Sequence, residues 1–279
     1  GFPWVYDKEV VKGGGEPGQL REVRDGQGKL LGTALVDRGW IAARVYRHDG
    51  GPLDKEWVYS VLDRAASLRH LVIDPETDGF RLVNAENDGL PGVRIDWWSH
   101  HAVVILDSPA CAPLLDLICD WLEERRQPRG IHLCYRADGR DNRDFSKVKP
   151  APGLLRGHES SGPVRVRERG LCIDVLPQDG PDVGLYADMR QVRAFLEPFW
   201  GGTSVLNTFA YTGAFSVAAA LNGASNVVSV DLSAKYLDRA EANFRANELD
   251  PGNFDFDVMD TFKALDRYRR TGRSFDRII

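Results

Sequence analysis

Residues 205–231, VLNTFAYTGAFSVAAALNGASNVVSVD, decide the fold class of the C-terminal part of the chain. An apolar strand over 204–207 runs into a turn with one glycine, Gly213, and a helix follows. A second apolar strand over 227–230 ends at an acidic residue, Asp231. Strand, helix and strand in this order are typical of a parallel α/β sheet. Such a sheet binds its ligand at the carboxyl ends of its strands.

The same alternation extends to both sides of this stretch. Before it, the apolar positions predict a helix over 188–199, in which Asp188 and Gln191 have the spacing of a capping box. The elements predicted after it are a helix from Ser233, a strand over 254–258, a helix over 261–270 and a strand that opens at Phe275. The C-terminal part is therefore predicted to be an α/β domain with about four parallel strands.

The loop between the first strand and its helix limits the class of ligand. Residues 207–215 hold a single glycine, whereas NAD and FAD need a G-x-G-x-x-G loop for close approach of the pyrophosphate. The G-x-x-x-x-G-K-[ST] pattern of a P-loop does not occur either. Asp231 lies 18 residues after Gly213, where a carboxylate accepts hydrogen bonds from ribose hydroxyls, and Asp260 is placed to accept from an adenine amino group. A nucleoside without phosphates fits this pattern, and we predict S-adenosylmethionine.

The first half of the chain has a different pattern. Residues 1–58 alternate short β-like runs with glycine turns, which predicts a small β-barrel or sandwich. The pattern further predicts amphipathic helices over 54–71 and 113–126, an aromatic hairpin over 81–98 and a strand over 171–176. We therefore expect three domains, which span 1–58, 59–176 and 177–279.

The composition excludes several classes of protein. With 43% hydrophobic and 28% charged residues, the chain can bury a core, which excludes intrinsic disorder for most of it. No stretch reaches the roughly 20 apolar residues that span a bilayer, and nothing at the start reads as a signal peptide. The four cysteines show no C-x-x-C pairing, and the six histidines show no metal-ligand spacing. We expect a cytoplasmic protein with no membrane segment and no metal site.

One segment is basic, although the whole chain carries a net charge of −5. Residues 134–169 hold nine basic and five acidic side chains, which suits either a local contact with phosphates or a solvated surface loop. The candidates for a phosphate contact are Arg136, Arg140, Arg143, Lys147 and Lys149, and Tyr135 and Phe145 are available for stacking on bases if the phosphates belong to a nucleic acid.

Two segments, Asn207-Thr-Phe-Ala-Tyr-Thr-Gly-Ala-Phe and Val228-Ser-Val-Asp-Leu-Ser, resemble the S-adenosylmethionine motifs of the bacterial 23S rRNA large-subunit methyltransferase I family. Three further segments resemble the same family. Gly1-Phe-Pro-Trp-Val-Tyr resembles the opening of its PUA domain, residues 84–96 its central hairpin, and residues 184–193 the segment before its first Rossmann-like strand. The resemblance covers the whole chain, and the motifs occur in the family's order.

The resemblance implies a multidomain fold of the α+β and α/β classes. Its parts would be a small PUA-like β-barrel, a central β-rich α+β domain and a partial, Rossmann-like class I methyltransferase sheet. It implies S-adenosylmethionine as the cofactor, ribosomal RNA as the partner and cytosine-C5 methylation as the activity. A homodimer stays open as the oligomeric state, because the fourth strand of a seven-stranded class I sheet would here be an exposed edge.

The resemblance also implies roles for individual residues. The donor pocket would be lined by Asn207, Thr208, Phe209, Tyr211, Thr212 and Gly213. Asp231 and the neighbouring Leu232 would lie at the ribose, and Asp260 at the adenine. The methionine end would be approached by Tyr186, Asp188, Arg190 and Arg193, since a guanidinium can pair with the carboxylate of the donor. A plain helix N-cap stays open as the role of Asp188, and a surface arginine as that of Arg193.

The chain departs from the family pattern after the strand that begins at Phe275. The family continues there with an Asp-Pro-Pro segment and, further on, a cysteine nucleophile, and neither follows before Ile279. Cytosine-C5 methylation needs such a thiolate, because it adds temporarily to carbon-6 of the ring. The cysteines that are present lie on or beside an amphipathic helix (Cys111, Cys119) or in apolar runs (Cys134, Cys172), as buried side chains do. We therefore expect a C-terminally truncated chain that does not complete the reaction, with its catalytic residues C-terminal to Ile279.

Two other functions stay open from the sequence. A relative that grips RNA through its N-terminal domains, without any chemistry, would carry the same motifs. A methyltransferase that acts on guanine would also carry them, since nothing in these residues separates guanine from cytosine.

Overall fold

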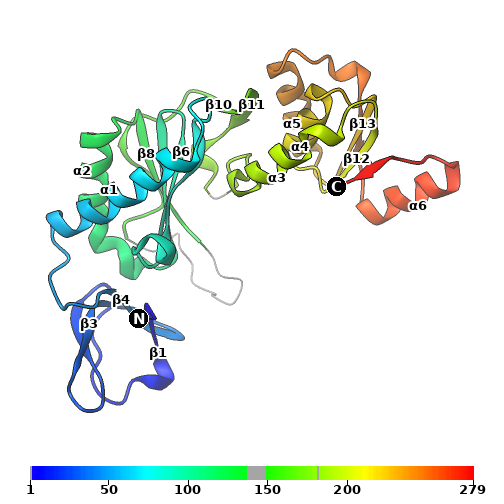
Figure 1. Cartoon of the computed structure of the whole chain (residues 1–279). Coiled ribbons are helices and arrows are strands. Elements are labelled where there is room, and N and C mark those ends of the chain that lie inside the picture. Colours follow the sequence, from blue (N-terminus) through cyan, green and yellow to red (C-terminus); the bar gives the residue numbers. More distant parts are fainter. Residues whose placement is uncertain (1, 137–148, 181) are drawn as a thin grey trace. The chain divides into compact units, whose positions relative to one another are not determined.

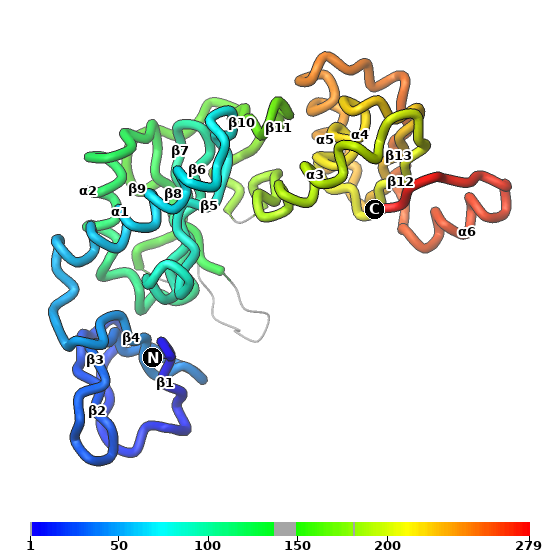
Figure 2. The backbone as a smooth tube through the Cα atoms, viewed as in Figure 1, coloured from blue at the N-terminus to red at the C-terminus, as the bar shows by residue number. Residues whose placement is uncertain are grey.

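The computed structural model describes residues 2–136, 149–180 and 182–279, and the chain divides into two compact units. The first unit comprises Gly1–Asp74, Phe80–Ser161 and Pro177–Pro181. The second unit comprises Pro75–Gly79, Gly162–Leu176 and Asp182–Ile279. Figure 1 and Figure 2 trace the chain through both units, from blue to red. The division into three domains with the boundaries given above stays a prediction.

The first unit opens with a four-stranded antiparallel sheet. Its strands are β1 (Trp4–Tyr6), β2 (Leu20–Arg24), β3 (Leu30–Val36) and β4 (Ile41–Arg47), in the spatial order β1-β4-β3-β2 (Figure 2). β1 and β2 are therefore its two edges, and no pairing between them closes the sheet in the described residues. Short turns join β2 to β3 and β3 to β4, in keeping with the glycines that separate these runs in the sequence.

A buried ion pair ties this sheet to the rest of the first unit. The Arg44 guanidinium on β4 donates from Nε to the Asp37 carboxylate over 2.9 Å, and the Ser108 hydroxyl donates to the same carboxylate over 2.6 Å. All three side chains are buried, where a polar group without a partner would destabilise the fold. The buried Tyr46 hydroxyl also donates to the Pro91 carbonyl over 2.8 Å. These bonds fasten the first sheet to the loops around the second sheet.

The second sheet of this unit has five strands. They follow one another in space as in sequence: β5 (Gly79–Asn84), β6 (Val93–Trp98), β7 (His101–Leu106), β8 (Gly130–Tyr135) and β9 (Gly153–Gly157). The helices are α1 (Lys55–Val72), which an Asp54 N-cap begins, and α2 (Leu115–Arg125). Their apolar positions pack with one face of β5 to β8 in a single core that includes Leu62, Ile118 and Trp121. Both helices lie where the sequence pattern predicts them.

The other face of this central sheet buries several ring nitrogens that lack hydrogen-bond partners within the described ranges. Trp98 and His101 are cross-strand neighbours, and His132 lies on the same face of β8. The ring centroids of His101 and His132 are 5.9 Å apart. Neither ring nitrogen of His132 has a hydrogen-bond partner among the described residues. Burial lowers the pKa of both histidines below the usual 6.5, because a charged imidazole would lose its hydration.

The second unit is built on a four-stranded parallel sheet. Its strands are β12 (Ser204–Thr208), β13 (Asn226–Asp231), β14 (Asp255–Val258) and β15 (Arg277–Ile278), in the order β14-β13-β12-β15. The connecting helices are α4 (Ala214–Leu221), α5 (Ala234–Ala246) and α6 (Thr261–Thr271) (Figure 1). From β12 the chain continues to β13 and β14 on one side, whereas β15 lies on the other side of β12. Open α/β sheets bind ligands at such a switch in strand order. The predicted α/β alternation is thus present.

A hairpin and a short helix complete the second unit. The hairpin consists of β10 (Val164–Glu168) and β11 (Leu171–Val175), and the helix is α3 (Arg190–Leu196). The longer helix predicted over 188–199 is α3 with one turn of 3-10 helix on either side. The predicted capping box at Asp188 and Gln191 is wrong, because the N-cap of α3 is Met189, which makes no side-chain capping bond.

The multidomain α+β and α/β fold predicted from the sequence is confirmed by these sheets. None of the helices in the described ranges has the length and hydropathy that crossing a bilayer requires.

The buried histidines make the stability of the first unit depend on pH. Because folding lowers the pKa of His101 and His132, the unfolded chain binds more protons below pH 6.5, and the free energy of unfolding falls as the pH drops through this range. We expect a loss on the order of 1 kcal/mol between about pH 7.5 and about pH 5. Urea denaturation followed by tryptophan fluorescence measures it, since six of the seven tryptophans lie in the first unit.

His132→Asn is expected to reduce this pH-dependent loss, because one of the two buried titrating groups is then absent and its repulsion of a charged His101 is removed as well. His70→Asn changes an exposed histidine of α1 and should leave the loss unchanged. A wild-type unfolding free energy that stays constant over this pH range would contradict the buried neutral pair.

Candidate functional site

Polar and aromatic residues gather at the carboxyl edge of the parallel sheet, where three loops begin. Residues 209–213 follow β12, residues 232–233 follow β13, and residues 259–260 follow β14. Because these strands are parallel neighbours, the three loops lie along one edge of the sheet.

Asp231, the last residue of β13, holds two of these loops together. Its Oδ2 accepts a hydrogen bond from the Tyr211 amide over 2.9 Å, and its Oδ1 accepts one from the Ser233 amide over 2.9 Å. The side chain is half-buried, and each carboxylate oxygen has a second lone pair for a donor from outside. Two neighbouring hydroxyls, such as those of a ribose, can donate to both oxygens at once.

The loop after β12 has a strained backbone. Phe209 and Tyr211 have positive φ values of 54° and 53°, a conformation that costs a bulky side chain on the order of 1–2 kcal/mol. Two bonds to β13 hold it: the Ala210 amide donates to the Val230 carbonyl, and the Tyr211 amide donates to Asp231. Strain of this kind persists where the surrounding structure fixes it, and it gathers at ligand sites.

Gly213 ends this loop and is required on two grounds. Its φ of 76° lies in the left-handed region that favours glycine. A Cβ at this position would also lie only 2.8 Å from the Cβ of Ala240. The glycine therefore lets α4 begin in close contact with α5.

Three tyrosines pack beside this loop. The Tyr211 ring centroid lies 5.2 Å from that of Tyr186 and 4.6 Å from that of Tyr236. The Tyr211 hydroxyl donates to the Asp182 carbonyl over 2.8 Å, and burial raises the pKa of Tyr211 well above the usual value of 10. This phenol is neutral and already bonded, whereas Tyr186 is 53% exposed and can meet a ligand.

The side chains of three residues expected to line the pocket form hydrogen bonds with other groups of the protein. The buried Asn207 amide donates to the Ser216 hydroxyl over 2.9 Å. The buried Thr212 hydroxyl donates to the Gly184 carbonyl, and the Thr208 hydroxyl donates to the carbonyl of Ile279. These side chains stabilise the loop, and Phe209, which is exposed, is the loop side chain that faces outward.

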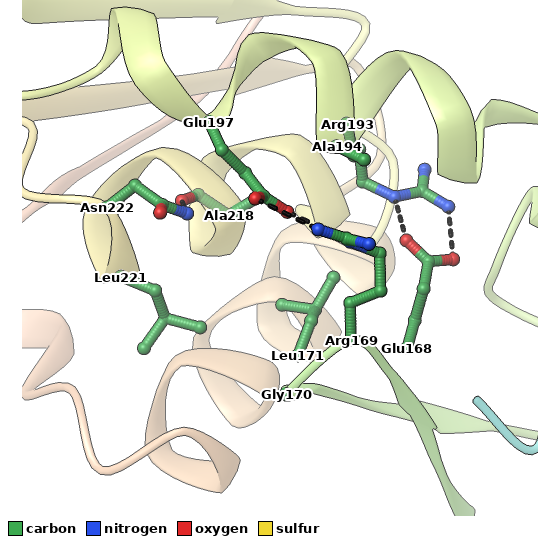
Figure 3. Close-up of a pocket in the computed structure, with 10 residues that line it drawn as sticks. All are labelled: Glu168, Arg169, Gly170, Leu171, Arg193, Ala194, Glu197, Ala218, Leu221 and Asn222. Atoms are coloured by element: carbon green, nitrogen blue, oxygen red, sulfur yellow. Dashed lines mark hydrogen bonds and ion pairs between the residues drawn. The ribbon is translucent and has the colours of Figure 1, made fainter. Parts of the chain in front are cut away.

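Arg193 on α3 has its partner within the second unit. Its Nε and Nη2 donate to the two oxygens of Glu168 over 2.6 Å and 2.7 Å (Figure 3). Nη2 also donates to the Tyr186 carbonyl over 3.0 Å. Both charged side chains are buried. Arg193 is therefore not a surface arginine, and its Nε and Nη2 are engaged by this bidentate pair, while its pairing with a donor carboxylate stays a prediction. Of its neighbours, Arg190 is buried and Asp188 is exposed.

The Arg193–Glu168 pair borders a hollow of about 240 Å³. The β10–β11 turn, α3 and the end of α4 form its walls, and Arg169 pairs with Glu197 beside it (Figure 3). Because α4 begins at the carboxyl edge of the sheet and runs back along it, its last residues lie toward the opposite edge. The hollow is thus separate from the loops that Asp231 joins.

The segments that follow β13 and β14 carry exposed apolar side chains. The Asp260 carboxylate caps α6 by accepting from the Lys263 amide over 3.0 Å. Leu232 after β13 is 70% exposed, and Phe262 in the first turn of α6 is 72% exposed. Two large apolar groups at this edge suit the faces of a flat base. Phe262 is absent from the residues predicted above, and its place two residues after Asp260 is the signal that could have identified it.

The predicted RNA contacts are described only in part. Arg136 and Lys149 are exposed, while Arg140, Arg143, Lys147 and the stacking candidate Phe145 lie outside the described residues. Tyr135 is buried, and its hydroxyl donates to the Pro150 carbonyl over 2.9 Å. The proposed stacking role of Tyr135 is therefore wrong, because its ring belongs to the core of the first unit.

Three of the four cysteines are not activated as nucleophiles. Cys111, Cys119 and Cys134 are buried, and burial raises their pKa values to about 11, about 11 and about 12. A thiol that stays protonated near neutral pH is a poor nucleophile. In the part of the chain that the structure describes, no group of three or more His, Cys, Asp or Glu side chains could hold a metal ion.

Comparison with known proteins adds sequence relatives for both parts of the chain. Residues 159–279 match the family model for S-adenosylmethionine-dependent methyltransferases, and residues 1–48 match that for a PUA-like domain. The chain is 36% identical to ribosomal RNA large subunit methyltransferase I of Pseudoalteromonas translucida, over 99% of this chain and 70% of the relative. It is 33% identical to the protein of the same name from Shewanella amazonensis, with the same coverage.

Two solved structures are also similar to this chain. A SAM-dependent methyltransferase from Streptococcus mutans superimposes with a TM-score of 0.85 at 25% identity, over 99% of this chain and 71% of that one. A methyltransferase complexed with S-adenosylhomocysteine (SAH) gives a TM-score of 0.86 at 25% identity, over 100% and 71%.

Gly213→Ala tests the turn at the site. The new Cβ would require a left-handed backbone and would meet Ala240, so we expect the free energy of unfolding to fall by roughly 1–3 kcal/mol. Gly201→Ala is the matched control, because its φ is not in the left-handed region and no heavy atom lies within 4 Å of its Cβ position. Thermal unfolding followed by circular dichroism measures both. Equal stability of the two variants would contradict the packing assigned to Gly213.

Proposed function

The chain belongs to the ribosomal RNA large subunit methyltransferase I family, and from this we propose that it acts in S-adenosylmethionine-dependent methylation of ribosomal RNA. The donor would bind at the carboxyl edge of β12, β13 and β14. When bound, S-adenosylmethionine supplies an electrophilic methyl group. The residues of this chain bind and orient it.

The observation that carries the proposal is the position of Asp231. Its carboxylate is fixed by two backbone amides, and its remaining lone pairs can accept the two ribose hydroxyls. We assign the adenine to the space between Leu232 and Phe262, with Asp260 accepting from its amino group. Both apolar side chains are exposed at this edge, so a base between them would remove apolar surface from water.

The methionine end of the donor would lie toward Tyr186, Asp188 and Arg190. In this arrangement Arg193 is a positioning residue, because it holds the Tyr186 carbonyl while paired with Glu168. The loop from Asn207 to Gly213 would meet the donor through its backbone and through the exposed Phe209 ring. The hydroxyls of Thr208 and Thr212 keep the loop in place.

We propose carbon-5 of cytosine as the methyl acceptor. Methylation there requires a thiolate that adds to carbon-6, and three of the four cysteines of this chain are buried with raised pKa values. Cys111, Cys119 and Cys134 would therefore not supply that thiolate, and the role proposed for these 279 residues is to bind the donor. RNA would contact the exposed Arg136 and Lys149, together with Arg140, Arg143 and Lys147.

Binding of SAH tests the donor site. Isothermal titration is expected to show one site per chain, and Asp231→Asn is expected to weaken binding at least about ten-fold, because an amide offers one acceptor oxygen instead of two. Asp238→Asn is the matched control, since Asp238 is exposed on α5 and should bind as the wild type does. Unchanged affinity of Asp231→Asn for SAH would contradict the role of Asp231. Absence of SAH binding by the wild type would contradict the proposed function.

Thiol labelling tests the account of the cysteines. With Ellman's reagent at about pH 8, we expect Cys111, Cys119 and Cys134 to react only after denaturation, because burial keeps them protonated and covered. Rapid labelling of any of these three in the native protein, located by mass spectrometry, would reveal an activated thiol. Such a thiol would be a candidate catalytic nucleophile within this chain.

A further inference from the structure

A polar side chain is buried on the apolar face of α5. Asn243 is fully buried, as are Leu237, Ala240 and Phe244 of the same helix. A buried amide costs free energy unless its donor and its acceptor are both bonded. Alanine or leucine would also form the interior of a helix better than asparagine does. The helix itself therefore has no need of an amide here, and the role of Asn243 lies in the bonds that it makes.

The Asn243 amide bonds two separate segments of the second unit. Its Oδ1 accepts from the Asp174 amide on β11 over 2.9 Å, and its Nδ2 donates to the Thr212 carbonyl over 2.8 Å. Since the oxygen must meet an N–H group and the nitrogen must meet a carbonyl, these two partners determine the orientation of the side chain. Asn243 thus joins β11 to residues 207–213 after β12, which we call the donor loop.

The donor loop is held at two consecutive residues. Asp231 accepts from the Tyr211 amide, and Asn243 donates to the carbonyl of the next residue, Thr212. The Thr212 hydroxyl in turn donates to the Gly184 carbonyl, just before the residues assigned to the methionine end of the donor. Thr212 therefore connects the ribose side of the proposed donor site to its methionine end, and Asn243 fixes the Thr212 carbonyl.

Both ends of the proposed donor site are tied to one hairpin. Asn243 ties the donor loop to β11. On β10, Glu168 pairs with Arg193, which donates to the Tyr186 carbonyl. β10 and β11 pair with each other along their whole length, so the two ties keep a fixed separation. A ligand that is held at its ribose and at its methionine end needs this separation to match its own length.

We propose that Asn243 is a positioning residue for S-adenosylmethionine, which acts through the Thr212 carbonyl rather than by contact with the donor. It sets the place of the donor loop relative to the β10–β11 hairpin. The proposal rests on the proposed function, because it assumes that the donor binds at the carboxyl edge of the sheet. It adds that the affinity for the donor depends on a hydrogen bond between α5 and the donor loop.

Asn247, one turn further along the chain from Asn243, provides a matched control. Its side-chain amide accepts from the Cys172 amide over 2.8 Å and donates to the Cys172 carbonyl over 2.6 Å. It therefore bonds β11 as Asn243 does, and none of its side-chain bonds in the described part of the chain goes to the donor loop. Aspartate at either position adds the same charge and turns a carboxylate oxygen toward a backbone carbonyl. Only Asn243→Asp breaks the bond to the donor loop.

Isothermal titration of the full chain with SAH tests the proposal. Asn243→Asp is expected to weaken SAH binding about 5- to 100-fold, because the buried Thr212 carbonyl loses its donor and the donor loop shifts. Asn247→Asp is expected to change the affinity less than about two-fold. Hydrogen exchange of the Tyr211 amide, followed by NMR, is the second readout. It should be faster in Asn243→Asp than in Asn247→Asp, whereas a merely structural role would affect this amide equally in both.

Thermal unfolding shows how much stability each variant has lost. If Asn243→Asp does not fold, Asn243→Ala and Asn247→Ala replace the pair, since neither adds a charge. If wild type binds SAH and the Asn243 variant binds it equally well, the positioning role is overturned and the proposed function stands. The same holds if the Asn243 and Asn247 variants weaken SAH binding equally, because the effect then runs through the hairpin. If wild type does not bind SAH, the proposed function fails and the positioning role fails with it.

Discussion

The two hydrogen bonds that Asp231 accepts from backbone amides determine the geometry of the candidate donor site. One bond holds the Tyr211 amide in a loop with positive φ at Phe209 and Tyr211, and the other holds the Ser233 amide at the start of α5. A strained loop persists only where such bonds outweigh its cost. The carboxylate therefore organises two loops and presents its remaining lone pairs at the edge of the sheet where a nucleoside can bind.

The first unit uses buried polar pairs in a comparable way. The Arg44–Asp37 pair with Ser108, and the bond from Trp4 to Glu86, fasten the first sheet to the central one. Because these anchors are buried or half-buried, aromatic side chains of the first sheet such as Trp40 can stay exposed without making the sheet mobile.

Much of the second unit could be predicted from the sequence, because its strands and helices alternate with clear periodicity. The pattern over 205–231 identified β12, α4, β13 and the acidic residue at the carboxyl end of β13. The capping box at Asp188 failed because a local spacing does not determine where a helix begins, and Met189 occupies the N-cap.

Other features depend on contacts between residues distant in sequence. Arg193 pairs with Glu168, 25 residues away, and no local pattern predicts that a hairpin would bring this carboxylate to α3. Tyr135 was predicted to be available for stacking on bases, yet it is the last residue of β8, which pairs with β7, and its ring packs in the core. The aromatic residues at the start of the chain fit a buried face as well as an exposed one, since alternation alone does not say which side of a strand is covered.

The most direct test of the central claim is a crystal structure of this chain with SAH. The account predicts the ribose hydroxyls within hydrogen-bond distance of both Asp231 oxygens, and the adenine between Leu232 and Phe262 beside Asp260. A nucleoside bound elsewhere, such as in the hollow beside Arg169 and Glu197, would contradict the assignment of the site to the carboxyl edge of the sheet.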